Sequence, residues 1–269
     1  FDVNVVEKGD IFNPTYDRLG FLGKGEIRLL VAKEFVDLFR SGSIKKMVVS
    51  YTIPLAVLLG MAWLIDFAEA PIPINLLSYA PFLGFFGFNF YSWLTILDSP
   101  EFMNGLPLRV PQLIRAKVLV YFIVTSWISL IFIILMAWRL EEWQSLPTSI
   151  VVMFANSIYI VALTAFLMGL RPNQAIFDAS IMVWFWIGTV LPLLGLFLLS
   201  FTQGDVSLYG NWWERASEDG LSATATMYDE GLVRQGYRGL LAISGFLLFA
   251  SAVLWKLMDR RWGRSQFNN

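Results

Sequence analysis

Amide and hydroxyl side chains are the groups that could bind a solute within the hydrophobic stretches of this 269-residue chain. Such groups hydrogen-bond to uncharged molecules, but near neutral pH they supply neither a proton nor a charge. They either line a path for a substrate or join neighbouring helices, which is the commoner use of polar residues in membranes. The candidates for the lining of a path are Asn89, Ser92, Asn156, Tyr159 and Thr164.

Charged side chains lie at the edges of the hydrophobic stretches, as Asp66, Asp98 and Arg139 do. Ion-coupled carriers place such groups near the middle of the membrane, so the sequence argues against that class. The sequence has no His or Cys, no HExxH or GxSxG pattern, and after Lys24 a glycine where a Walker motif needs Ser or Thr. We therefore expect no enzymatic activity in the chain by itself, and no cofactor or metal.

The polar loop 98–117, DSPEFMNGLPLRVPQLIRAK, carries a positive excess between two hydrophobic stretches. Its beginning resembles a helix N-terminus, with Pro100 early and Glu101 in the first turn. Pro107 and Pro111 break that helix and begin a second one, which continues into the next stretch. The loop is either an ordinary cytoplasmic loop or a coupling element that receives force from a soluble partner. The candidate contact residues are Glu101, Phe102, Met103, Leu106, Pro107, Leu108, Arg109 and Arg115.

The hydrophobic stretches predict an all-α integral membrane protein. Hydrophobic residues make up 57% of the chain, above the roughly 45–50% of soluble proteins, and the mean hydropathy is +0.60. Six stretches have about the 20 residues that a bilayer requires, and together they define a transmembrane domain over 47–269. The predicted spans are Met47–Ile65, Tyr79–Leu97, Val118–Trp138, Ser149–Leu170, Ile181–Phe201 and Gly239–Met258.

An amphipathic helix is expected over 24–46, just before the first span. Apolar residues recur there at helical spacing, although Glu34 falls inside the apolar stripe and Val36 outside it. Such a helix lies in the membrane interface or packs on a partner, and the nearby span favours the interface. Residues 1–23 lack a signal-peptide pattern and are expected to form an irregular cytoplasmic lead-in. Gly84 and Gly87 are expected to allow close helix contact.

The distribution of Lys and Arg predicts the orientation. Both residues concentrate in the amphipathic helix, in 98–117 and after the last span, whereas the opposite side has only Arg139, Arg215, Arg234 and Arg238. The positive-inside rule therefore places both termini in the cytoplasm and the loop 202–238 outside. A net charge of −1 gives no indication of a nucleic-acid partner.

This order of elements resembles the permease subunits of ABC-2 type exporters. The closest local likeness runs from Glu101 to Arg109 and from Gln112 to Lys117, with the Leu106-Pro107 pair, although Ala116 stands where family members often have glycine. The resemblance implies a multi-pass protein of a prokaryotic plasma membrane, with the helix before the first span as an elbow. It also implies a second permease subunit, which is identical or related. A separate ABC ATPase would carry ATP and Mg and dock on loop 98–117.

The alternative from another class is a non-catalytic scaffold subunit of a larger membrane complex, for example a redox complex. The absence of histidine weakens a haem-binding role for such a subunit. Co-purification with an ATPase would favour the exporter, and co-purification with redox subunits alone would favour the scaffold.

Overall fold

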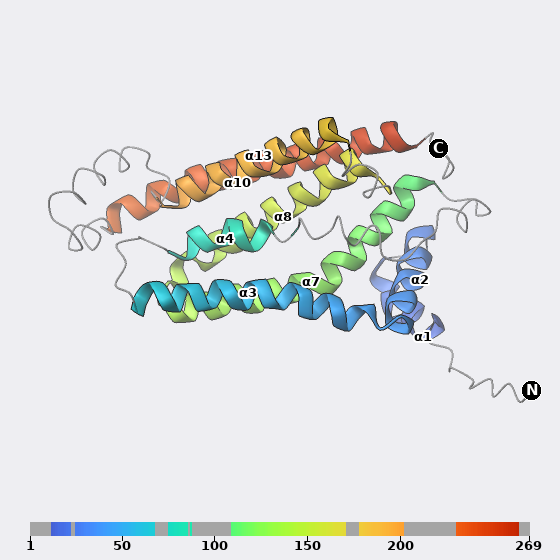
Figure 1. Ribbon diagram of the computed structural model, residues 1–269, viewed down its shortest axis with the longest axis horizontal. Helices are drawn as coiled ribbons and strands as arrows, with labels where there is room; N and C mark the ends of the chain where they lie inside the picture. Colours follow the sequence, from blue (N-terminus) through green and yellow to red (C-terminus); the bar gives the residue numbers. More distant parts are fainter. Residues whose placement is uncertain are drawn as a thin grey trace, which may run out of the picture.

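The computed structural model describes residues 12–22, 25–67, 75–85, 87, 109–170, 178–201 and 230–263, and this part of the chain is all α-helical apart from short 3-10 turns (Figure 1). The elements, in order, are α1 (Phe12–Arg18), η1 (Leu19–Leu22), α2 (Glu26–Arg40), α3 (Ser43–Phe67), α4 (Leu76–Phe85), α7 (Val110–Leu140), η3 (Trp143–Ser145), α8 (Leu146–Met168), α10 (Ala179–Phe201) and α13 (Glu230–Trp262).

Five of the helices are long and apolar enough to cross a membrane, which identifies a multi-pass integral membrane protein. They are α3, α7, α8, α10 and α13, and each contains most or all of a predicted span. The short apolar helix α4 covers only the beginning of the predicted span Tyr79–Leu97, and the remainder of that span lies outside the described residues. Five of the six predicted spans are therefore confirmed as helices.

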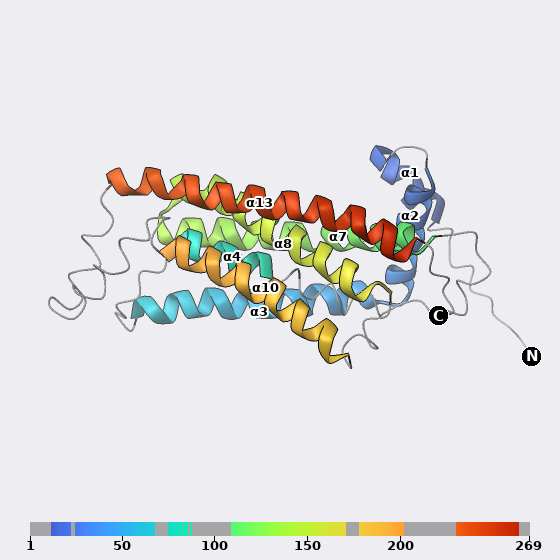
Figure 2. The ribbon, with the colours of Figure 1, turned by 90° about the horizontal axis from the view of Figure 1, so that it is seen from above.

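The long helices run side by side, with α8 at the centre (Figures 1 and 2). Two thirds of the apolar window of α8 (67%) is buried, whereas only 11% of the window of α3 is. Hydrogen bonds join α8 to α13 at both ends. Near the start of each helix, Ser145 and Tyr237 share a hydrogen bond of 2.9 Å. Near the end of each helix, Trp262 Nε1 donates to Phe166 O at 3.1 Å. The two helices therefore run parallel over their whole common length.

Glycine lets α4 approach α8 closely, as the sequence predicted. A Cβ on Gly84 would lie 2.5 Å from Met153 O, and a Cβ on Gly87 would lie 2.9 Å from Ser157 O. Both neighbours are backbone atoms of α8, which cannot move aside cheaply. The contact is further fixed by Asn156 of α8, whose Nδ2 donates to Pro81 O of α4 at 2.8 Å.

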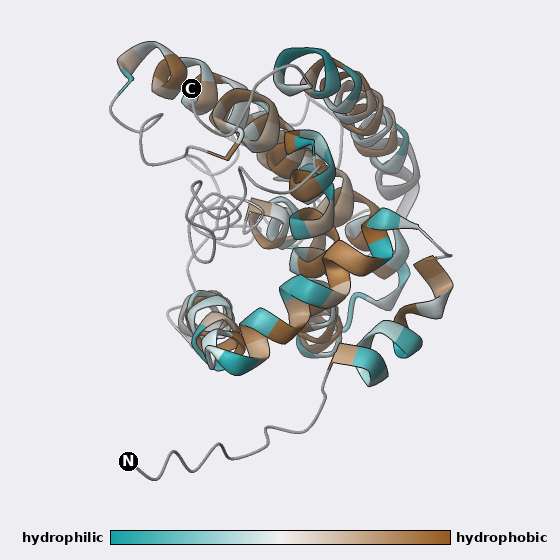
Figure 3. Ribbon diagram, turned by 90° about the vertical axis from the view of Figure 1, so that its right-hand side faces the viewer, coloured by the Kyte–Doolittle hydropathy of each residue, from teal (hydrophilic) through white to brown (hydrophobic). Residues whose placement is uncertain are grey.

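The helix before the first span lies across the end of the bundle (Figures 1 and 3). The helical pattern over 24–41 corresponds to α2, whereas Ser43–Lys46, at the end of the segment 24–46, belongs to α3. The break is at Gly42, which has a φ of 67°, in the left-handed region that favours glycine. This turn allows α2 to cross the axis of the bundle while α3 follows it.

Two segments that were predicted to lie outside the spans are partly helical. Residues 12–22, expected within an irregular lead-in, form α1 and η1. Pro14 is in the first turn of α1, where a missing N–H costs nothing, so it permits a helix start there and not only a turn. At the other end of the chain, α13 begins at Glu230, inside the loop predicted over 202–238.

Candidate functional site

The described part of loop 98–117 is its end, where the chain enters α7. Arg109 and Arg115 lie in this part. The other predicted contact residues lie outside the described residues: Glu101, Phe102, Met103, Leu106, Pro107 and Leu108. The structure therefore shows how the end of the loop is fastened to the bundle.

The start of α7 is fixed by polar contacts that follow from its sequence. Arg109 is extended and serves as N-cap, and its N–H donates to Gln112 Oε1 at 3.0 Å. Pro111 occupies the first turn, where proline is favoured. The helix then continues through Arg115 and Lys117 without a break, which confirms the predicted second helix of the loop.

A buried ion pair joins α7 to α2. Lys117 Nζ lies 3.1 Å from Glu34 Oε2, and both side chains are only 1% exposed. Each charge has lost its hydration and depends on the other, because an isolated buried charge is very costly. This pair explains why Glu34 falls within the apolar stripe of α2: the helix buries that stripe against α7, and Lys117 neutralises the carboxylate.

Two further contacts lie beside the buried pair, and both are more exposed to solvent than it is. Gln112 Nε2 donates to Glu26 Oε2 of α2 at 2.7 Å, and Arg115 forms an ion pair with Asp259 of α13. The side chains of Arg115 and Asp259 are each about two-fifths exposed (43% and 41%), so solvent weakens their attraction. Within one turn and a half, the start of α7 thus contacts both α2 and α13.

Arg28 lies off the apolar stripe that helical spacing predicts for α2, yet its side chain is not exposed. It is buried by α1, where its Nε donates to Tyr16 O at 2.8 Å and its guanidinium lies 3.9 Å from the centre of the Tyr16 ring. Val36, outside the predicted stripe, is buried as well. The sequence reasoning missed this second covered face because it assigned no helix to residues 12–22.

The predicted path-lining residues make packing contacts where they are described. Asn156 bonds to α4, and Thr164 Oγ1 donates to Ile160 O of its own helix at 2.7 Å. Tyr159 is half-buried near Gly188 of α10. Asn89 and Ser92 lie outside the described residues. The Asn156 contact joins two helices, whereas the Thr164 bond stays within α8, and a path-lining role stays a prediction.

At the opposite end of the bundle, the side chains of Asn75 and Glu142 hold the start of α4. Asn75 Oδ1 accepts from Ser78 N at 2.8 Å, while its Nδ2 donates to Ser200 O of α10 at 3.0 Å. Glu142, between α7 and η3, accepts from Leu76 N at 2.9 Å. Burial raises the pKa of the Glu142 carboxyl above its ordinary value, and the hydrogen bond from Leu76 lowers it in part.

This arrangement gives Glu142 a pH-dependent effect on stability. Because the pKa of Glu142 is higher in the folded chain than in the unfolded chain, protonation of this carboxyl stabilises the fold. This stabilisation is fully present below pH 4.5, the ordinary pKa, and is lost as the pH rises through the raised pKa. We expect Glu142→Gln, which keeps the acceptor for Leu76, to be at least as stable as the unmodified protein at neutral pH. Thermal unfolding in mild detergent at pH 4 and pH 7 should show this advantage shrinking in acid.

The matched control is Glu142→Ala, which removes the acceptor. It is expected to lose about 0.5–2 kcal/mol, the range for a lost helix N-cap. A Gln variant that is as unstable as the Ala variant at neutral pH would contradict this account.

Among the described residues, no group of three His, Cys, Asp or Glu side chains could hold a metal ion. No family model, curated protein or solved structure matches the chain. The contacts described above are therefore the basis for any assignment of function.

Proposed function

We propose that this chain is the transmembrane permease subunit of an ATP-driven exporter of the ABC-2 type. In this proposal α4 and the residues that follow it complete a sixth span, and α2 is the interfacial elbow. Both termini face the cytoplasm of a prokaryote, and loop 98–117 receives force from a separate ATPase subunit, which carries ATP and Mg. The chain itself supplies the translocation path.

The observation that carries this proposal is the fastening of the start of α7. A permease without an ATPase must take mechanical work through a contact that does not yield. Loop 98–117 leads directly into the helix that is tied to α2 through Lys117 and Glu34 and to α13 through Arg115 and Asp259. Displacement of the loop would thus move the elbow, the third span and the last span together.

The exposed apolar faces of α3 and α10 also suit a subunit of a larger membrane assembly. Only 11% of the apolar window of α3 and 17% of that of α10 are buried within the chain. Their exposed side chains are large and apolar, such as Ile53 and Met61 on α3 and Trp184 and Leu191 on α10. Such faces fit lipid tails or a second permease subunit, by packing rather than by charge.

The test is the double substitution Phe102→Ala with Leu106→Ala in the full chain, expressed with its ATPase. Truncation of a buried anchor typically costs ~2 kcal/mol or more, which is about a 30-fold loss of affinity. We expect the ATPase to be lost on purification in mild detergent and its membrane-dependent ATP turnover to fall, while the permease itself is still made and inserted.

The matched control is Arg109→Ala, which removes an exposed charge at the end of the same loop and is expected to have a much smaller effect. If the double variant retains both the ATPase and its turnover, the loop is not the coupling element. Co-purification with redox subunits alone would favour the scaffold function instead.

A further inference from the structure

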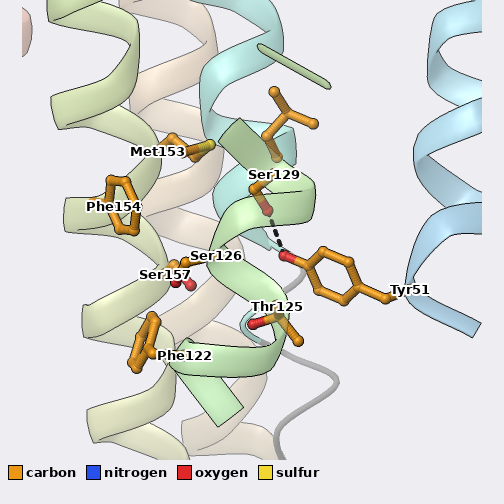
Figure 4. Close-up of a pocket in the computed structure, with 9 residues that line it drawn as sticks. Tyr51, Phe122, Thr125, Ser126, Ser129, Met153, Phe154 and Ser157 are labelled. Carbon is orange, nitrogen blue, oxygen red and sulfur yellow. Dashed lines mark hydrogen bonds between the residues drawn. The ribbon is translucent and has the colours of Figure 1, made fainter. Parts of the chain in front are cut away.

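In the interior of the bundle, several hydroxyl groups are engaged in hydrogen bonds between and within helices. Tyr51 of α3 shares a hydrogen bond of 2.6 Å with Ser129 of α7 (Figure 4), and Thr125 Oγ1 donates to Tyr121 O at 2.8 Å. The side chains that could bind a charged ligand lie on the surface instead, and two basic ones are exposed near the end of α13.

One exposed face of α13 is apolar along its middle and basic at its end. Helical spacing places the members of this face within about 100° of the circumference of the helix. The apolar members are Phe246, Phe249, Val253 and Leu257, and the basic members are Lys256 and Arg260.

The dimensions of this face match those of a bilayer. From Phe246 to Leu257 the helix rises about 16 Å, close to the roughly 15 Å of one leaflet of the hydrocarbon core. Arg238 is exposed on the same side of the helix, about 27 Å from Lys256 along the axis. The face therefore crosses the core of the membrane. Its end at Lys256 and Arg260 reaches the headgroups of the leaflet that the predicted orientation places on the cytoplasmic side.

Lys256 and Arg260 are available to bind an anion. The acidic residue between them, Asp259, forms an ion pair with Arg115 of α7. In the part of the chain that the structure describes, neither Lys256 nor Arg260 forms an ion pair of its own. Residues four apart on a helix are neighbours, with about 5–6 Å between their Cβ atoms, so both side chains can reach one phosphate group.

The helix α2, at the same end of the bundle, does not offer such a pair (Figures 1 and 2). Arg28 is buried, and Lys33 Nζ lies 3.1 Å from Asp37 Oδ2. This leaves α2 with Arg40 as its exposed basic side chain without a described acidic partner. An anion at the surface of the membrane is therefore bound better by the end of α13.

We propose that Lys256 and Arg260 bind the headgroup phosphate of an anionic phospholipid, whose acyl chains lie along the apolar part of the same face. Arginine binds a phosphate through two N–H groups, and lysine binds it as a point charge. The occupant is a lipid rather than a soluble anion, because the two charges continue directly into an exposed apolar surface one leaflet long. Basic residues at this level are attracted to anionic lipids.

The test compares phosphatidylglycerol, which is anionic, with phosphatidylcholine, which has the same acyl chains and no net charge. The full chain is purified in mild detergent, and native mass spectrometry measures the dissociation constant of the first added lipid. Each basic residue near an anionic surface contributes about 1 kcal/mol, or about fivefold in affinity. We therefore expect phosphatidylglycerol to bind about 30-fold more tightly than phosphatidylcholine. Lys256→Gln with Arg260→Gln is expected to remove this difference and to leave the affinity for phosphatidylcholine unchanged.

The matched control is Lys45→Gln with Lys46→Gln, which removes two exposed basic side chains at the start of α3, at the same end of the bundle. Adjacent residues on a helix do not face each other, so this variant is expected to keep its affinity for phosphatidylglycerol within about threefold.

Three results would overturn the proposal. They are equal affinity of the unmodified protein for the two lipids, undiminished binding of phosphatidylglycerol by the α13 variant, and an equal loss in the control variant. Each variant is first checked for the elution volume of the unmodified protein. If the double variant differs, Lys256→Gln and Arg260→Gln are measured separately, each with an expected loss of about fivefold. The measurement requires no ATPase, so its result does not depend on the proposed function.

Discussion

Replacement of Lys117 by Met is expected to destabilise the chain by about 3–5 kcal/mol, the range for breaking a buried ion pair by removing one partner. The reason is the 1% exposure of both Lys117 and Glu34, because the substitution removes the cation that the buried carboxylate of Glu34 faces. The measurement is thermal unfolding of the purified protein in mild detergent, together with the yield of folded protein from the membrane.

The double variant Lys117→Met with Glu34→Gln tests the cause of the loss. Because it removes both charges, it is expected to recover most of the lost stability, as substitution of both partners of a buried pair is often tolerated. The matched control is Arg115→Met, two residues away on the same helix. Its ion pair with Asp259 is about two-fifths exposed, so a loss of less than about 1 kcal/mol is expected. Equal losses for Lys117→Met and Arg115→Met would contradict the assigned role of burial.

Replacement of Gly84 by Ala is expected to separate α4 from α8. The added Cβ would lie 2.5 Å from Met153 O and 2.9 Å from Asn156 Cβ, so the helices must shift and the hydrogen bond from Asn156 to Pro81 must lengthen. Overpacking of this kind typically costs about 1–3 kcal/mol. The measurement is again thermal unfolding in mild detergent.

The control is Gly60→Ala in α3, where an added Cβ meets no atom within 4 Å. Alanine favours a helix over glycine by about 0.5–1 kcal/mol, so this variant is expected to be slightly more stable than the unmodified protein. The two substitutions are chemically identical and differ in their surroundings. A change of the same sign and size in both would show that α4 and α8 do not pack as closely as described.

The spans could be predicted from the sequence because hydrophobicity is a local property. A run such as Val118–Trp138 needs no partner to be recognised, and the structure confirms it within α7. The start of α7 at Val110 was harder to place, since Arg115 and Lys117 lower the hydropathy of its first turns. The prolines gave the better signal there, because Pro111 marks a first turn whatever charges follow.

The polar contacts of the site could be predicted only in part. Glu34 stood out as a break in the apolar stripe, but its partner Lys117 is 83 residues away in the sequence, and helical spacing carries no information at that distance. The burial of Arg28 could not be predicted for a related reason: helical periodicity indicates one buried face, whereas α2 is covered by α7 on one side and by α1 on another.

The buried pair of Lys117 and Glu34 also imposes an order on the biosynthesis of the protein. Glu34 leaves the ribosome 83 residues before Lys117, which at about 5–20 residues per second is a delay of roughly 4–17 s. During this interval α3 can already enter the membrane, but the carboxylate of α2 has no cation to neutralise it in an apolar site and must stay in contact with water. Docking of α2 is therefore a late step of assembly, and a chain whose synthesis stops before α7 retains α2 at the membrane surface.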